Sequence, residues 1–171
     1  MRLFIRMAEA AQATITPLPG PASIPAAVVS YLDAHDLPLS LRIAGDPEIA
    51  GLDWAACPAL TVQTGRAEAG DAASLTSCIA GIAETGTLML ASGPLSPTTL
   101  NFLPDAHIVV LPRERIVATY EEGWARIGTM PRLVTFITGP SRTADIEQRL
   151  VLGAHGPRRL HILMLGVALH E

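Results

Sequence analysis

The sequence predicts a layered α/β protein with a mostly parallel sheet. Short apolar runs typical of buried strands recur along the chain, stretches with helical spacing alternate with them, and 49% of the residues are hydrophobic. Strands that alternate with helices favour a parallel sheet covered on both faces. A length of 171 residues favours one domain over the whole chain, 1–171.

The chain is expected to begin with a helical lead-in at about residues 1–35. Leu3, Met7 and Ala10 form one stripe of a helix over residues 1–13. The Pro-rich stretch "TPLPGPAS" ends this helix, and Ser23 caps a second one over "SIPAAVVSYLDAHD". "LSLRIA" and "ALTVQTG" are predicted strands, separated by "DPEIAGLDW" as a loop or short helix.

The second half is predicted to continue with a hairpin, "GIAE" and "TLMLAS", whose tight turn lies near Thr85–Gly86, because glycine permits positive φ. "SPTTLNFLP" is a loop with at most one helical turn, and "HIVVLP" is a strand. A helix is expected over residues 113–128, where apolar residues recur at spacings of four, four and three. "LVTFIT" and "LHILML" are the last two predicted strands.

The composition argues against nucleic-acid binding. The net charge is −4 and only 4% of the residues are aromatic, so residues for phosphate neutralisation and base stacking are scarce. All 12 basic residues are arginine. The absence of lysine excludes a Schiff-base lysine and a P-loop lysine.

The two cysteines, Cys57 and Cys78, stand alone, without a CxxC pair or a histidine at metal-ligand spacing. No metal site and no bound cofactor are therefore expected. Two free thiols suit a reducing cytoplasm, where we expect the protein to be localised. The opening residues are too short and too interrupted for a signal peptide, and no apolar run reaches the ~20 residues of a membrane span.

One candidate site follows the strand "LVTFIT", where Gly139 and Pro140 turn the chain. Ser141 or Thr143 can cap a short helix that runs through residues 145–147. The same hydroxyls, with free N–H groups and the charge of Arg142, can instead bind an anion. The two interpretations are compatible.

Glu84 is the second candidate. It stands between apolar runs, so we expect a partly buried carboxylate that needs hydrogen-bond partners. It is either a structural brace or a nucleophile or general base. His155, between two glycines, is either a bracing residue or a ligand donor. Ser96, Thr98 and Asn101 belong to a polar loop that can line the same cleft.

The stretches "AETGTLML", "NFLPDAHIVVL" and "ITGPSRTADIEQRLVLGAHGPRRLHILML" resemble the LUD-domain family, specifically its lactate-utilisation protein C branch. The resemblance covers roughly residues 60–165. It implies a fold similar to the ribose-phosphate isomerase and CoA-transferase superfold, with three α/β/α layers around a mixed sheet. It also implies work beside an iron–sulfur subunit and a cysteine-rich subunit in the oxidation of L-lactate to pyruvate.

The matching positions suggest a cleft with the Glu84 turn as one wall and the segment that starts at Gly139 as the other. Glu84 is the catalytic candidate by analogy with the glutamate nucleophile of CoA-transferases, although "AETGT" lacks the further glycines of their motif. The candidate ligand-binding residues are Thr85, Gly86, Thr87, Asn101, Ser141, Arg142, Thr143, Asp145, Glu147, His155 and Gly156.

Three functions are compatible with these observations. The first is a subunit of a lactate-oxidation system that has no redox centre of its own and binds a small anion or a partner-borne cofactor. The second is a free-standing enzyme that acts on acyl or phosphate esters through Glu84. The third is an assembly protein without a ligand. Turnover by the purified chain alone separates the second from the first.

Overall fold

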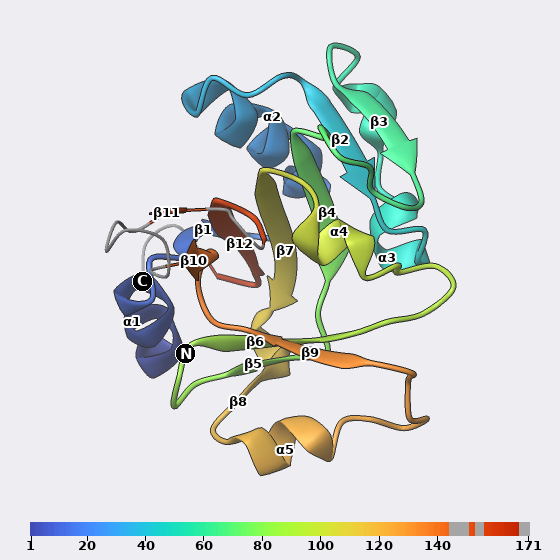
Figure 1. The fold of residues 1–171 in the computed structure, drawn as a ribbon. Coiled ribbons are helices and arrows are strands. Elements are labelled where there is room, and N and C mark those ends of the chain that lie inside the picture. Colours follow the sequence, from blue (N-terminus) through green and yellow to red (C-terminus); the bar gives the residue numbers. More distant parts are fainter. Residues whose placement is uncertain (144–150, 153–155, 168–171) are drawn as a thin grey trace.

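The computed structural model describes residues 1–143, 151–152 and 156–167 (Figure 1). Its centre is a six-stranded parallel sheet, so the predicted α/β class with a mostly parallel sheet is confirmed. In sheet order the strands are β1 (Thr14–Leu18), β12 (Arg159–Leu165), β7 (Ala106–Pro112), β4 (Ala73–Ser77), β2 (Ser40–Ile43) and β3 (Thr61–Thr64).

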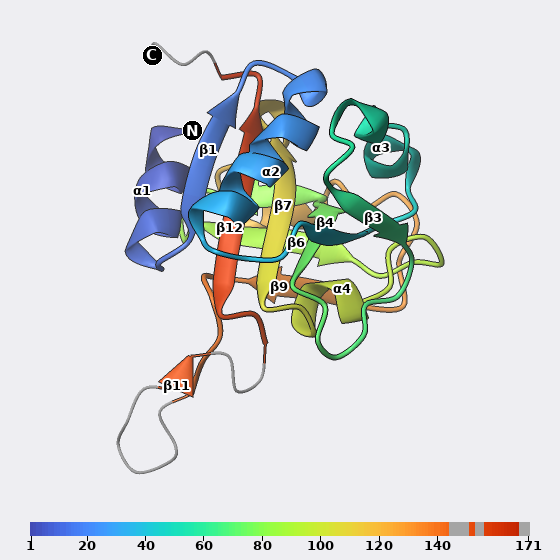
Figure 2. The same ribbon diagram turned by 90° about the horizontal axis from the view of Figure 1, so that it is seen from above.

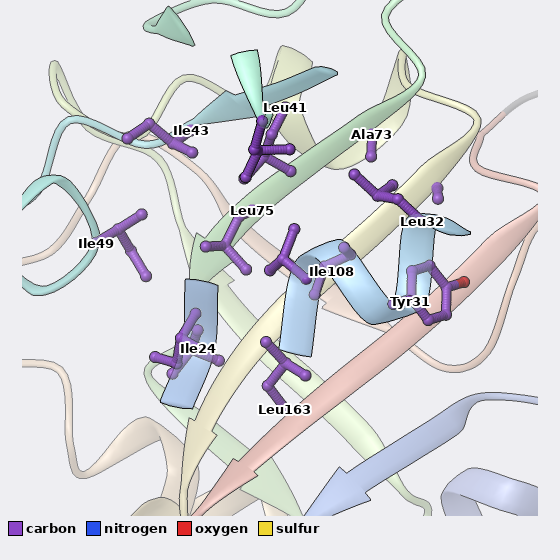
Figure 3. Close-up of a cluster of buried hydrophobic side chains, with 14 of the residues drawn as sticks. Ile24, Tyr31, Leu32, Leu41, Ile43, Ile49, Ala73, Leu75, Ile108 and Leu163 are labelled. Carbon is purple, nitrogen blue, oxygen red and sulfur yellow. The ribbon is translucent and has the colours of Figure 1, made fainter. Parts of the chain in front are cut away.

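Helices α2 (Ile24–Ala34) and α3 (Pro47–Ala50) cover one face of this sheet (Figure 2). Ile24 and Leu32 of α2 are buried against Leu75, Ile108 and other strand residues, as Figure 3 shows. Short 3-10 turns, Pro21–Ser23 and Trp54–Ala56, precede α2 and follow α3.

The opposite face is covered by α1 (Arg2–Ala10) and a second, four-stranded sheet. Successive residues of a strand point to opposite faces, so Ile108 of β7 packs towards α2 while Val109 packs in a cluster with Phe4 of α1 and Leu88 of the second sheet. In order, the second sheet contains β8 (Ile116–Val117), β5 (Ala80–Ile82), β6 (Thr87–Ala91) and β9 (Val134–Ile137).

The remaining elements are short. They are α4 (Thr99–Phe102), a 3-10 turn at Arg113–Arg115, α5 (Tyr120–Trp124), and the antiparallel pair β10 (Arg142–Thr143) and β11 (Val151–Leu152). Arg142 and Thr143 lie in β10, and the short helix predicted through residues 145–147 lies outside the described residues.

Two predictions about elements need correction. The lead-in at about residues 1–35 was predicted as helical, yet it also contains β1, an edge strand in which the missing N–H of Pro17 is tolerated. The predicted helix over residues 113–128 is mostly wrong. Ile116 and Val117 form β8 beside β5, and a helix begins only at Tyr120, after the cap residue Thr119.

Candidate functional site

A hollow lies at the carboxyl ends of β2 and β4. These two strands are neighbours in the sheet. The next strand of this sheet along the chain lies on one side for β2, where it is β3, and on the other side for β4, where it is β7. Such a change of direction opens a crevice where α/β proteins commonly bind ligands. We call this hollow, of about 780 Å³, the switch-point crevice; its polar lining comes from Asp46, Glu48, Ser77, Cys78, Ser96, Arg115 and Arg126.

Asp46 is the unusual group in the crevice. It follows β2 and precedes α3, but its side chain makes no capping hydrogen bond to that helix. Both carboxylate oxygens are buried and neither has a hydrogen-bond partner of good geometry among the described residues. Burial, followed by the negative charge of Glu48, raises the pKa of the Asp46 carboxyl, although the backbone N–H groups of Ile49 and Glu48 lie near enough to counteract part of this rise. This carboxylate is therefore available to a hydroxyl or another donor that enters the crevice.

Two arginines supply positive charge to the crevice. Arg115 follows β7 and donates to Cys78 O at 2.8 Å and to Glu48 Oε1 at 2.9 Å. These bonds orient a guanidinium that carries five N–H donors in all. Arg126 is exposed and donates to Glu114 O at 2.6 Å. The crevice thus combines the Asp46 carboxylate with two arginines, one of which is paired with Glu48.

The cysteine in the crevice is inert. Cys78 is buried, its thiol donates to Val110 O at 3.4 Å, and burial raises the pKa of this thiol to about 12. A nucleophilic cysteine needs a thiolate near neutral pH, so Cys78 serves packing.

Glu84 lies on the surface, so the expectation of a partly buried carboxylate was wrong. Its Oε1 accepts a hydrogen bond from the backbone N–H of Tyr120 at 3.2 Å, at the first residue of α5. The crevice is lined by other residues. The geometry of Glu84 is that of a brace for the start of α5.

Hydroxyl groups join the Glu84 turn to the segment before Gly139. Thr87 Oγ1 lies 2.6 Å from Thr138 Oγ1, and the Tyr120 hydroxyl lies 3.0 Å from Thr85 Oγ1 and 3.1 Å from Thr87 Oγ1. Hydrogen bonds therefore link the Glu84 turn to Thr138, the residue before the second predicted wall.

The glycines of these two segments pack against α1. Gly86 has φ +69°, and a Cβ added there would lie 2.2 Å from Ala8 N. Gly139 has φ +74°, and its added Cβ would lie 2.0 Å from Ala11 O. Both positions need glycine for conformation and for close approach, so Gly86 serves helix packing in addition to the predicted turn.

The match to known proteins falls on the strands and turns just described. The family model for the LUD domain matches residues 59–165, more than half of the chain. The chain belongs to the LUD-domain family. The crevice residues Ser77, Ser96 and Arg115 lie within the matched part, whereas Asp46 precedes it.

Several relatives of this LUD domain are similar over shorter stretches. A lactate utilization protein C from Deinococcus radiodurans is 39% identical over 98 residues, which are 55% of this chain and 46% of that protein. An uncharacterised protein from Neisseria meningitidis serogroup B is 44% identical over 89 residues, which are 50% of this chain and 38% of that protein. The chain thus spans less than half the length of these curated relatives.

A solved structure resembles the LUD domain over nearly its whole length. The crystal structure of a DUF162 family protein from Deinococcus radiodurans is 26% identical, with a TM-score of 0.66 over 96% of this chain and 95% of that one.

The carboxy-terminal candidates of the LUD domain are only partly described. Ser141 donates its backbone N–H to Pro157 O at 2.9 Å, and an added Cβ on Gly156 would lie 3.2 Å from Ser141 Cβ. Ser141 and Gly156 therefore lie close together. Gly156 lines a separate hollow with Asp105 and Arg158, near the amino end of β7.

Some predicted ligand residues lie outside the described residues, namely Asp145, Glu147 and His155. For Arg142 and Thr143 the structure describes only the backbone, in strand β10.

Asn101 is buried on α4 of the LUD domain rather than exposed to a cleft. Its side-chain oxygen, Oδ1, has no hydrogen-bond partner among the described residues.

His107 is a second buried polar residue. Its Nε2 lies 2.8 Å from Thr76 Oγ1, whereas its Nδ1 has no partner among the described residues. Burial lowers the pKa of His107 to about 3, so this imidazole is neutral and belongs to the core.

Within the described residues, no group of three or more His, Cys, Asp or Glu is arranged to hold a metal ion. In the same part of the chain, no helix combines the length and the apolar character needed to cross a membrane.

Asp46 and Arg115 were missed by sequence reasoning, although a signal was present. Each closely follows a predicted strand, 39–44 and 107–112, and residues after parallel strands converge at one edge of the sheet. The prediction also needed β4, whose end supplies Ser77 and which was not recognised as a strand.

Proposed function

We propose that this LUD domain acts in lactate utilisation and that its switch-point crevice binds a small hydroxy- or oxo-carboxylate. The observation that carries the proposal is the buried Asp46 carboxylate, without a well-formed hydrogen bond among the described residues, beside Arg115 and Arg126. Lactate presents two matching groups: a carboxylate for an arginine and a hydroxyl that can donate to Asp46. Relatives named lactate utilization protein C support this choice of substrate.

The proposed role is that of a subunit in the cytoplasm. Oxidation of lactate removes the hydroxyl proton and two electrons with a second proton. A carboxylate with a raised pKa suits acceptance of the hydroxyl proton, whereas two isolated cysteines are too few for a four-cysteine iron–sulfur cluster. We therefore assign the electrons to iron–sulfur and cysteine-rich partner subunits.

The test is calorimetric titration of the purified chain with L-lactate, pyruvate and propionate. Propionate lacks only the hydroxyl of lactate. A site that hydrogen-bonds the hydroxyl should bind L-lactate at least about tenfold more tightly than propionate, since a hydrogen bond to a charged group contributes ~1.5–3 kcal/mol.

Asp46→Asn should remove this preference and leave propionate binding nearly unchanged. Asp33→Asn is the matched control, because Asp33 is an exposed residue of α2 that does not line the crevice. Equal binding of lactate and propionate by the unmodified chain would contradict the proposal. Lactate oxidation by the chain alone would instead favour the free-standing enzyme.

A further inference from the structure

A second hollow, of about 680 Å³, shares a wall with the switch-point crevice. The loop after β6 lines both: Ala91 and Ser96 face the crevice, while Ser92 and Thr98 face the second hollow. Arg66, which follows β3, and Arg132, which precedes β9, also line the second hollow, so we call it the arginine pocket.

The charge of the arginine pocket is uncompensated. Arg66 and Arg132 are exposed, and neither has a hydrogen bond or ion pair within the described part of the chain. By contrast, Arg42 is paired with Asp71, and Arg115 with Glu48. The described lining of the pocket contains no carboxylate. Two like charges around one hollow repel each other, and an anion between them relieves that repulsion.

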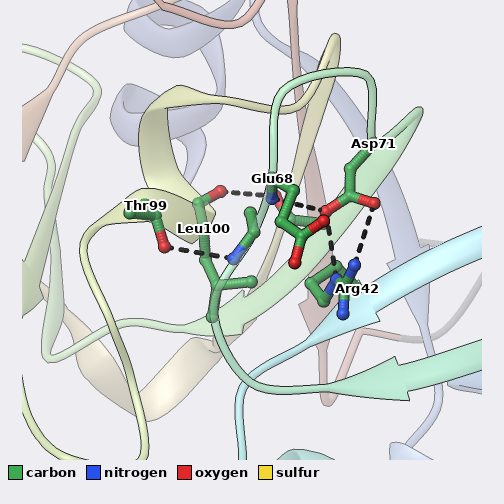
Figure 4. A network of polar contacts seen from close by, with 7 residues as sticks. Arg42, Glu68, Asp71, Thr99 and Leu100 are labelled. Carbon is green, nitrogen blue, oxygen red and sulfur yellow. Dashed lines mark hydrogen bonds and ion pairs between the residues drawn. The ribbon is translucent and has the colours of Figure 1, made fainter.

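The backbone beside Arg66 is fixed to one end of the shared loop. Ala67 donates its N–H to Thr99 Oγ1 at 3.1 Å. Asp71 holds the segment that follows Arg66 in place. Its carboxylate accepts hydrogen bonds from Glu68 N at 2.8 Å and from the Arg42 guanidinium at 3.0 and 3.2 Å (Figure 4).

The backbone beside Arg132 is fixed to the other end of the loop. Leu133 donates its N–H to Ser92 Oγ at 3.1 Å, and Ser92 donates its own N–H to Leu133 O at 2.9 Å. The two arginines therefore come from segments that are tied to opposite ends of one loop. A site held in this way loses less entropy when a ligand binds than one on free loops.

We propose that the arginine pocket binds the phosphate group of a small phosphorylated molecule. A guanidinium group can donate two parallel hydrogen bonds to two oxygens of one phosphate. The Thr98 hydroxyl supplies another donor in the same pocket. The volume of the hollow is in the range of sites for whole small molecules rather than for a bare ion. Pro94, Pro97 and Pro131 give apolar walls for the body of such a ligand. This site is separate from the proposed lactate site.

The test is calorimetric titration of the full chain with inorganic phosphate, pyrophosphate and ADP, and with citrate as a polycarboxylate. We expect pyrophosphate or ADP to bind with a Kd of about 1 mM or tighter and more strongly than citrate. Inorganic phosphate should bind more weakly than either if the ligand carries its phosphate on a larger body.

Arg66→Ala and Arg132→Ala should each weaken that binding at least about tenfold, the usual effect of removing a charge-assisted bond. Arg6→Ala is the matched control: it removes one exposed arginine from α1, on the other side of the molecule from the loop after β6 (Figure 1). Because neither pocket arginine has a bonded partner in the described residues, both variants should unfold at the temperature of the unmodified chain.

The proposal is overturned if neither pyrophosphate nor ADP binds below about 10 mM, if citrate binds as tightly as they do, or if the two pocket variants bind as well as Arg6→Ala. L-lactate titrations of the same variants keep the two proposals apart. Loss of Arg66 and Arg132 should leave lactate binding unchanged, because neither residue lines the switch-point crevice.

Discussion

Gly86 shows how a residue in a family motif can serve packing. Its φ of +69° is costly for other residues, by about 1–2 kcal/mol, and a Cβ there would lie 2.2 Å from the backbone of Ala8. Overpacking against backbone adds ~1–3 kcal/mol. We therefore expect Gly86→Ala to lower the free energy of unfolding by about 2–5 kcal/mol, measured by urea denaturation.

Gly128→Ala is the control for that substitution. Gly128 has no positive φ, and an added Cβ would meet nothing within 4 Å. Its free energy of unfolding should stay within about 0.5 kcal/mol of the unmodified protein. Equal effects of the two substitutions would show that α1 does not pack on the Gly86 turn as described.

Glu84 and Thr119 act together at the scale of an element, because both accept N–H groups at the start of α5. Thr119 Oγ1 accepts from Glu122 N at 3.4 Å, and Glu84 Oε1 accepts from Tyr120 N at 3.2 Å. A carboxylate near a helix amino terminus is also favoured by the helix dipole. Glu84→Ala should therefore lower the free energy of unfolding by about 0.5–1 kcal/mol.

The control is Glu9→Ala, an exposed substitution on α1. The measurement is again urea denaturation, followed by lactate titration of both variants. Unchanged stability of Glu84→Ala with loss of lactate binding would support the catalytic alternative for Glu84 instead.

Elements with a clear apolar pattern were predictable, whereas elements determined by their neighbours in space were not. "LHILML" is an almost continuous apolar run and is a buried strand, as expected. Residues 113–128 show helical spacing, but Ile116 and Val117 gain more from pairing with β5 than from a helix, since β-branched residues suit strands. That partner strand lies about 35 residues earlier in the chain. Hydrophobic periodicity is detected in windows of about 11–18 residues, so it cannot reveal this pairing.

At the scale of the whole molecule, two buried histidines make the fold sensitive to acid. His161 stacks on Tyr31 with ring centroids 4.1 Å apart, and burial, followed by the charge of His35, lowers its pKa to about 4. Burial lowers the pKa of His107 to about 3. Below pH 6.5 the unfolded chain binds protons that the folded chain does not, so stability is full above that pH and falls as the pH drops towards 4.

Each of these histidines should lower the free energy of unfolding by about 1.4 kcal/mol per pH unit in that window. Urea denaturation between pH 7 and 4.5 measures the slope. His161→Gln removes one titrating group, so its slope should be shallower than that of the unmodified chain. An identical slope would mean that His161 is not buried in the neutral form.

The candidate site depends on the order of strands, which local sequence does not specify. The Glu84 turn and the segment that starts at Gly139 were predicted to face each other because a family resemblance linked their motifs. Asp46 and Ser77 are neighbours in the crevice only because β2 lies beside β4. The residues of the two strands do not specify this pairing, because buried parallel strands have similar apolar sequences.

The pairing of β1 with β12 also determines when the fold can be completed during synthesis. Thr14 of β1 bonds to His161 of β12, 147 residues later in the chain. Ribosomes add ~5–20 residues per second, so β1 waits roughly 7–30 s for its sheet partner. During that interval an apolar segment with unpaired backbone groups is exposed. Ribosome-associated chaperones that shield nascent chains should therefore increase the soluble yield of this protein. The increase should be larger than for a protein whose first strand pairs with the next strand in the chain.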